Sequence, residues 1–157
     1  MATQWTAGLT DNTTLPAATL NTIGAAWENY TPSMVGWTQG NGTFYARYCQ
    51  IQKMVTFEMT FTVGSTSSTA ALGPIFGLPI GARTGNGAGF GFSGMGVDVS
   101  VGSRSPLRAW TISTSSFYPV LTNTTTTYGD TTYISSTTPF TWATGDLLYM
   151  TGTYEAA

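Results

Sequence analysis

The sequence predicts an all-β protein, an antiparallel β-sandwich of the jelly-roll type preceded by a short N-terminal arm and helix. Residues 55–63 alternate strictly, with large apolar side chains at odd positions and polar ones, mostly threonine, at even positions. This period of two is typical of a strand that buries one face. Several short runs of this kind follow along the chain with turn signals between them, a spacing that favours sandwiches and barrels.

Residues 1–30 form a separate unit in this prediction, an arm followed by a helix. Pro16 suits the first helical position, and Thr31-Pro32 ends the helix because a residue before proline is pushed toward extended geometry. Four apolar residues spaced three, four and three apart form a heptad seam: Leu20, Ile23, Trp27 and Tyr30. So short a helix is marginal alone. Either the sandwich of its own chain or symmetry-related copies must cover its apolar edge, and the pattern leaves both open.

Residues 31–157 are expected to form the β-sandwich domain. Its predicted strands are Met34–Thr38, Thr43–Gln50, 55–63, Ile75–Ile80, Gly89–Val101, Leu107–Ser113, Phe117–Leu121 and Asp146–Tyr154. Gln52-Lys53 joins the second and third of these strands into a hairpin. The polar stretches 64–74 and 122–139 are predicted to be loops.

The chain is poor in charge, with a net charge of −2 and only 8% charged residues. Soluble domains average about 25%, so this composition favours a protein that is one part of a larger assembly. The five basic residues are scattered, which argues against nucleic acid as a partner. No apolar run approaches the ~18 residues of a membrane span. The N-terminus has no signal-peptide pattern, so we expect synthesis in the cytoplasm without export.

The residue types needed for catalysis are sparse. Histidine is absent, which removes the usual general base near neutral pH and the commonest metal ligand. The seven carboxylates form no local catalytic or metal-binding motif, so neither a metal nor a cofactor is predicted. A polysaccharide hydrolase needs two carboxylates that face each other across a glycosidic bond. Distant residues could converge to make such a pair, and this remains a remote alternative.

The aromatic residues indicate a second alternative, a carbohydrate-binding module. Aromatic rings that stand exposed among threonine, serine and asparagine can stack on sugars, while the polar groups bond the sugar hydroxyls. The first candidates are three tyrosines in or beside the long polar stretch near the C-terminal third: Tyr118, Tyr128 and Tyr133.

Several short motifs, taken in order, resemble small virion proteins of tailed bacteriophages, known as minor tail, tail-fibre or head-fibre proteins. The motifs are Leu15–Ile23, Ala26–Pro32, Gly42-Thr43 with Ile51–Val55, Gly77-Leu78-Pro79, Phe140–Asp146 and Gly152–Glu155. In the family's strand–turn–strand, to which Ile51–Val55 corresponds, the middle residue of the turn is usually glycine. This chain has Gln52 there. The stretch from Gly81 to Thr138 carries little of the resemblance.

The resemblance implies a non-enzymatic structural protein on the exterior of a phage particle, made in the bacterial host cytoplasm. Such proteins are usually trimers whose N-terminal arm attaches to the particle while the β-sandwich projects. We expect homotrimers whose arm contacts other virion proteins, and a host surface glycan is a candidate partner of the projecting sandwich. It therefore favours symmetry-related copies as the cover of the seam. The residues expected to serve anchoring and oligomerisation are Trp5, Leu15, Leu20, Ile23, Trp27 and Tyr30.

Overall fold

The computed structural model describes residues 26–69, 73–83, 89, 91–123 and 130–157, with the side chains of 123–131 left out. The predicted helix before Ala26 therefore lies outside the described residues. Ten strands are present in the described part: β1 (Glu28–Asn29), β2 (Met34–Val35), β3 (Thr43–Ile51), β4 (Met54–Thr62), β5 (Ile75–Gly77), β6 (Gly91–Asp98), β7 (Ser103–Thr111), β8 (Ser116–Asn123), β9 (Asp130–Tyr133) and β10 (Leu147–Glu155).

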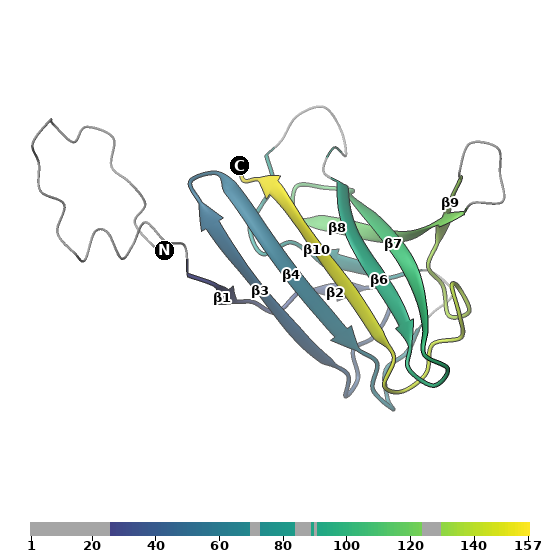
Figure 1. Ribbon diagram of the computed structural model, residues 1–157. Coiled ribbons are helices and arrows are strands. Elements are labelled where there is room, and N and C mark those ends of the chain that lie inside the picture. Colours follow the sequence, from purple (N-terminus) through teal and green to yellow (C-terminus); the bar gives the residue numbers. More distant parts are fainter. Residues whose placement is uncertain (1–25, 70–72, 84–88, 90, 124–129) are drawn as a thin grey trace, which may run out of the picture.

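The strands form one antiparallel sheet that curls on itself (Figure 1). Its order is β1-β3-β4-β10-β6-β7-β8-β5-β2, and β9 pairs with β8. The all-β antiparallel class is thereby confirmed, and no helix occurs in the part of the chain that the structure describes. The finer prediction of a jelly-roll sandwich stays a prediction, because hydrogen bonds run through a single continuous sheet.

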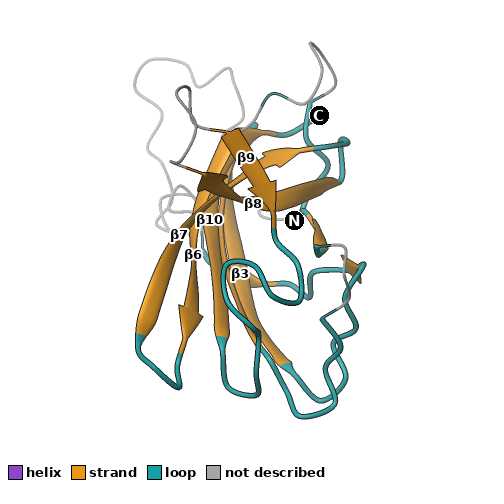
Figure 2. Cartoon of the chain, turned by 90° about the vertical axis from the view of Figure 1, so that its right-hand side faces the viewer, coloured by secondary structure: helices purple, strands orange, loops and turns teal. Residues whose placement is uncertain are grey.

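Figure 2 shows the curl of the sheet from the side, with β8 and β9 turned across the long strands. Ring contacts place β8 and β5 across the core from β4 and β3. The ring of Phe57 in β4 lies 5.5 Å from that of Phe117 in β8, and Phe44 in β3 lies 6.0 Å from Phe76 in β5. Phe57, Phe76 and Phe117 have no solvent exposure. Burying one such side chain contributes about 1.5–3 kcal/mol, so the inner face of the curled sheet holds most of the stability.

The β3–β4 hairpin has the register that a two-residue turn imposes. Ile51 pairs with Met54, and the pairing continues residue by residue to Thr43 opposite Thr62. Gln52 in the turn has a φ of 53°, in the left-handed region that favours glycine. This is the position where the resembling family usually has glycine.

Two short strands differ from the expectations. The seam residues Trp27 and Tyr30 are not helical, since Glu28–Asn29 forms β1 against β3 and the Tyr30 amide donates to the Ala46 carbonyl. A spacing of three fits a helix, but it also fits an edge strand whose rings contact different neighbours. The second difference is β9, which lies within the polar stretch 122–139 predicted to be a loop.

Candidate functional site

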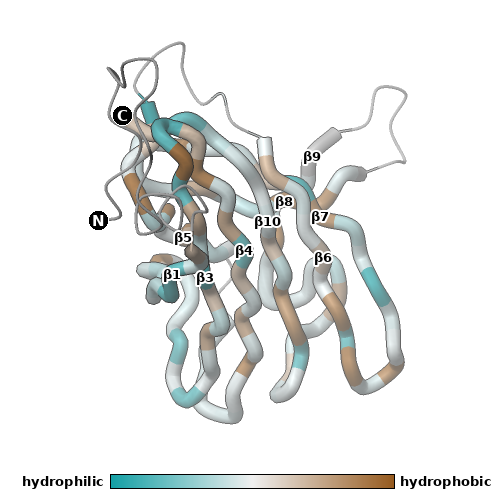
Figure 3. Tube along the Cα trace, turned by 60° about the vertical axis from the view of Figure 1, so that its left-hand side comes forward, coloured by the Kyte–Doolittle hydropathy of each residue, from teal (hydrophilic) through white to brown (hydrophobic). Residues whose placement is uncertain are grey.

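The candidate site is the solvent side of β1, β3, β4 and β10, called here the outer face. Burial alternates along β4 and β10, and the hydropathy of successive residues changes along these strands (Figure 3). Because paired residues of antiparallel strands point to the same side, the register tells which side chains meet there. The outer face carries many threonines: Thr43, Thr56, Thr60, Thr62, Thr151 and Thr153.

Arg47 on β3 is the centre of a polar and aromatic cluster on this face. Its guanidinium carbon lies 4.6 Å from the centroid of the Trp27 ring and 5.7 Å from that of Tyr45, within cation–π range. Its Nε donates to Oε1 of Glu58, opposite on β4, at 2.6 Å. The cluster thus joins Trp27 at the edge to β3 and β4, and it holds Arg47 in one orientation.

Two exposed tyrosines lie in one row that runs across three strands of the outer face. Tyr45 on β3 and Tyr149 on β10 both pair with Thr60 on β4, one from each side. Tyr45 is 56% and Tyr149 37% exposed, and Trp27 nearby is 44% exposed. Neighbouring strands lie about 4.8 Å apart, so the two tyrosine Cα atoms are about 10 Å apart. Two accessible aromatic side chains therefore stand on either side of a small hydroxyl side chain.

Threonine side chains continue along the outer face toward the β3–β4 turn. Thr151 lies in the next row, and Thr56 and Thr153 lie in the row after it. The hydroxyls of Thr56 and Thr153 are 3.0 Å apart, and Thr151 donates to the Phe57 carbonyl at 3.0 Å. These bonds fix the threonine rotamers on the outer face. Cys49, which pairs with Thr56, is half-buried on this side rather than in the core.

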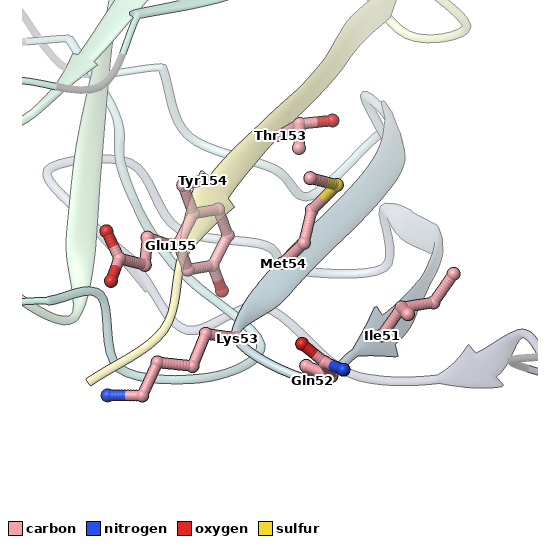
Figure 4. A pocket seen from close by; sticks show the side chains of 7 residues that line it. All are labelled: Ile51, Gln52, Lys53, Met54, Thr153, Tyr154 and Glu155. Carbon is pink, nitrogen blue, oxygen red and sulfur yellow. The ribbon is translucent and has the colours of Figure 1, made fainter. Parts of the chain in front are cut away.

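A pocket of about 570 Å³ opens where the outer face ends at the β3–β4 turn (Figure 4). Its lining residues are Ile51, Gln52, Lys53, Met54, Thr153, Tyr154 and Glu155. Ile51 and Met54 give it an exposed apolar side, and Glu155 on the rim pairs with Arg83 at 2.7 Å. The pocket could accept a small amphipathic group.

Tyr154 anchors this end of the sheet from the inside. Its hydroxyl donates to the Ile80 carbonyl at 2.6 Å and accepts from the Ile80 amide at 3.2 Å. Burial raises the pKa of Tyr154 to about 12, an effect that the hydrogen bond with Ile80 opposes and a nearby Tyr48 adds to. At any ordinary pH this hydroxyl is therefore a neutral donor that ties β10 to the segment after β5.

Of the three tyrosines predicted to contact a glycan, the structure brings two together. The rings of Tyr118 on β8 and Tyr133 on β9 meet edge to face with centroids 4.8 Å apart, and Tyr133 is 61% exposed. Burial raises the pKa of Tyr118, while a hydrogen bond with the Gly73 backbone lowers it and Tyr133 adds a smaller upward effect. Tyr118 thus fastens a loop, and Tyr133 is the accessible ring. Tyr128 lies outside the described residues.

Of the residues predicted for anchoring and oligomerisation, the structure describes only Trp27 and Tyr30. Trp5, Leu15, Leu20 and Ile23 lie outside the described part of the chain. Trp27 stands on the outer face over Arg47. Tyr30 packs inward, edge to face with Tyr48 at 6.0 Å, and burial raises its pKa. These two rings therefore point to opposite sides of β1 and form no common seam.

The residues of the outer face that sequence reasoning missed are Tyr45, Arg47, Glu58 and Tyr149. A signal for one contact was present: a two-residue turn at Gln52-Lys53 puts Arg47 directly opposite Glu58. The placement of Tyr149 beside Thr60 had no such signal, since β10 reaches β4 from the far end of the chain.

The carboxylates of the described side chains serve structural contacts. Glu58 and Glu155 form ion pairs with arginines, and Glu28 accepts from the Tyr48 hydroxyl at 2.8 Å. Asp98 and Asp146 accept backbone amides. Within the described ranges, no three acidic, cysteine or histidine side chains gather as metal ligands.

Comparisons with protein-family models, with curated proteins and with solved structures give no match to this chain. The resemblance to phage virion proteins therefore stays a prediction. In the ranges that the structure describes, no helix has the length and apolar character needed to cross a membrane.

Proposed function

We propose that this protein is a non-enzymatic structural component of a tailed-phage virion. In this proposal the part of residues 1–30 that precedes β1 anchors it to the particle and to two further copies of itself, and the β domain is displayed outward. The outer face is then the surface that meets the environment of the particle. A position on the tail or fibre and a position as a capsid or collar decoration both fit this role.

The observation that carries the proposal is the convergence of separate sequence markers at one end of the sheet. Ile51–Val55 forms the β3–β4 turn, and Gly152–Glu155 pairs directly with residues of β4 beside it. Tyr154 within the second segment bonds Ile80, immediately after the Gly77-Leu78-Pro79 marker. Three motifs of the phage resemblance, distant along the chain, thus form one structural unit, which supports a shared architecture.

The carboxylate contacts support the non-enzymatic part. Hydrolysis of a glycoside needs one carboxyl group that can give up a proton and a second that can attack or activate water. The acidic side chains that the structure describes are held by arginine, tyrosine or backbone amide partners instead. We therefore favour a binding role over polysaccharide hydrolysis. Turnover of a host polysaccharide that a single carboxylate substitution abolished would contradict this choice.

The test uses the full chain in solution and on particles. Light scattering at micromolar concentration should give the mass of a trimer, and the double variant Leu20→Glu, Ile23→Glu should give a monomer with the same β-sheet circular dichroism. Antibody labelling of phage particles in electron micrographs should mark their exterior. A monomeric full chain would contradict the anchoring role, and unlabelled particles that lack the chain by mass spectrometry would contradict the virion assignment.

A further inference from the structure

We propose that the outer face binds a neutral glycan, with sugar rings over Tyr45 and Tyr149 and with the Arg47–Glu58 pair bonding the hydroxyls. This rests on the display function proposed above and names what the displayed surface takes. The site differs from the Tyr118–Tyr133 pair, which lies on β8 and β9.

The first support is the spacing of exposed rings. Tyr45 and Tyr149 flank Thr60 on adjacent strands, about 10 Å apart by strand spacing. An extended oligosaccharide laid across the strands can put successive apolar sugar faces over the two rings and pass over Thr60 between them. Aromatic side chains supply a large apolar contact with little loss of conformational freedom.

The second support is a fixed donor beside a fixed acceptor. The bond from Arg47 Nε to Glu58 Oε1 leaves the two terminal nitrogens of the guanidinium and the second carboxylate oxygen outside that bond. Neighbouring sugar hydroxyls each donate and accept, so they match such a pair. Both side chains are about a third exposed, at 35% and 38%, and Trp27 and Tyr45 hold the guanidinium from its sides. A polar pair already ordered before binding lowers the entropic cost of binding.

Charge and surface chemistry decide the class of ligand. Arg47 and Glu58 cancel each other, and the adjoining rows present Thr60, Thr151 and Thr153. An acidic polymer would need an excess of basic side chains. The centre of an interface between protein copies is depleted in charge and close-packed with apolar groups, whereas here Thr60 separates the two tyrosines and a charged pair lies in the next row. A neutral, hydroxyl-rich chain complements this face best.

The test is isothermal titration of the full chain with neutral hexasaccharides, namely cellohexaose, maltohexaose and chitohexaose, and with hyaluronan as an acidic probe. At least one neutral probe should bind, and Tyr45→Ala, Tyr149→Ala and Arg47→Met should each weaken its affinity by about tenfold or more, or about 1.4 kcal/mol. Tyr133→Ala is the matched control, an exposed tyrosine outside the site, and should leave the affinity unchanged. Thermal melting of each variant confirms folding.

Any of four binding results would overturn the proposal: no neutral probe bound by the folded protein, preference for hyaluronan, loss of binding in Tyr133→Ala, or binding unaffected in both outer-face tyrosine variants. Light scattering on the same samples separates the two proposals. If glycan binding fails while the wild type remains a trimer, only the ligand assignment falls. If the double variant Tyr45→Ala, Tyr149→Ala has a different oligomeric mass from the wild type, the outer face is an interface between copies and not a glycan site.

Discussion

Replacement of Asp146 by alanine should be one of the most destabilising single substitutions at a polar residue in this protein. Asp146 precedes β10 and is 1% exposed. Its Oδ1 accepts the Val99 amide at 2.9 Å, and its Oδ2 accepts the Ala143 amide at 2.7 Å. Its own carbonyl accepts the Val63 amide. One side chain therefore closes the β6–β7 turn onto the start of β10, at the end of the sheet away from the pocket.

The size of the effect follows from the two amides that lose their acceptor. Both bonds are part-buried, and a hydrogen bond to a charged group contributes about 1.5–3 kcal/mol. Asp146→Ala should therefore lower the free energy of unfolding by about 3–5 kcal/mol. For a chain of this length each kcal/mol shifts the melting temperature by about 2–4 °C, so the variant should melt about 6–20 °C below the wild type.

Thermal unfolding followed by circular dichroism measures this, with Asp98→Ala as the matched control. Asp98, the half-buried last residue of β6, also accepts backbone amides, from Ser100 at 3.0 Å and Val101 at 3.3 Å, but these bonds are exposed, so water can replace them. Its loss should cost less than about 1 kcal/mol. Equal destabilisation by the two substitutions, or no shift in Asp146→Ala, would refute the reasoning from burial.

Two further substitutions probe the inner face. Tyr154→Phe removes both bonds to Ile80 and should cost about 1–3 kcal/mol at neutral pH. Since the folded pKa of about 12 lies above the usual 10.0, Tyr154 contributes stability that is present below pH 10 and lost as the pH rises toward 12. Urea unfolding from pH 8 to 12 should show a smaller alkaline loss in the variant; an identical loss would contradict this. Gly152→Ala puts a Cβ 2.2 Å from the Phe92 ring and should cost about 1–3 kcal/mol. Gly91→Ala is the control, because a Cβ there meets no atom within 4 Å, and its free energy of unfolding should stay within about 0.5 kcal/mol of the wild type. Thermal melting compares the two variants, and equal destabilisation would contradict the overpacking argument.

The long strands could be predicted from sequence because the alternation of apolar and polar side chains identifies them. Alternation in 55–63 requires a buried face, and a two-residue turn then fixes the register of β3 against β4. The short strands lacked this signal. Residues of β9, Asp130–Tyr133, contain a single large apolar side chain, and their pairing with β8 depends on where the preceding segment returns. In β1, pairing with the edge of β3 outweighs a spacing that also fits a helix.

The candidate site was harder to foresee than the fold, for a physical reason. Sequence tells which residues face solvent but not which strands lie side by side, and the outer face joins β4 to β10 across the length of the chain. Asp146 shows the same limit: a residue after Gly145 is a reasonable turn residue, yet its burial depends on the β6–β7 turn folding over it. The tyrosines chosen from the polar stretch were plausible as exposed rings, and Tyr133 is one.

The alternation that makes the fold predictable also separates stability from recognition. Phe61 is fully buried on β4, and its truncation to alanine would cost about 3–5 kcal/mol. Thr60, the next residue back, lies on the outer face between Tyr45 and Tyr149, where a substitution typically changes stability by less than about 0.5 kcal/mol. Residues at even positions of β4 can therefore change without loss of the core. In the display role proposed above, new ligand specificities would arise on an unchanged scaffold.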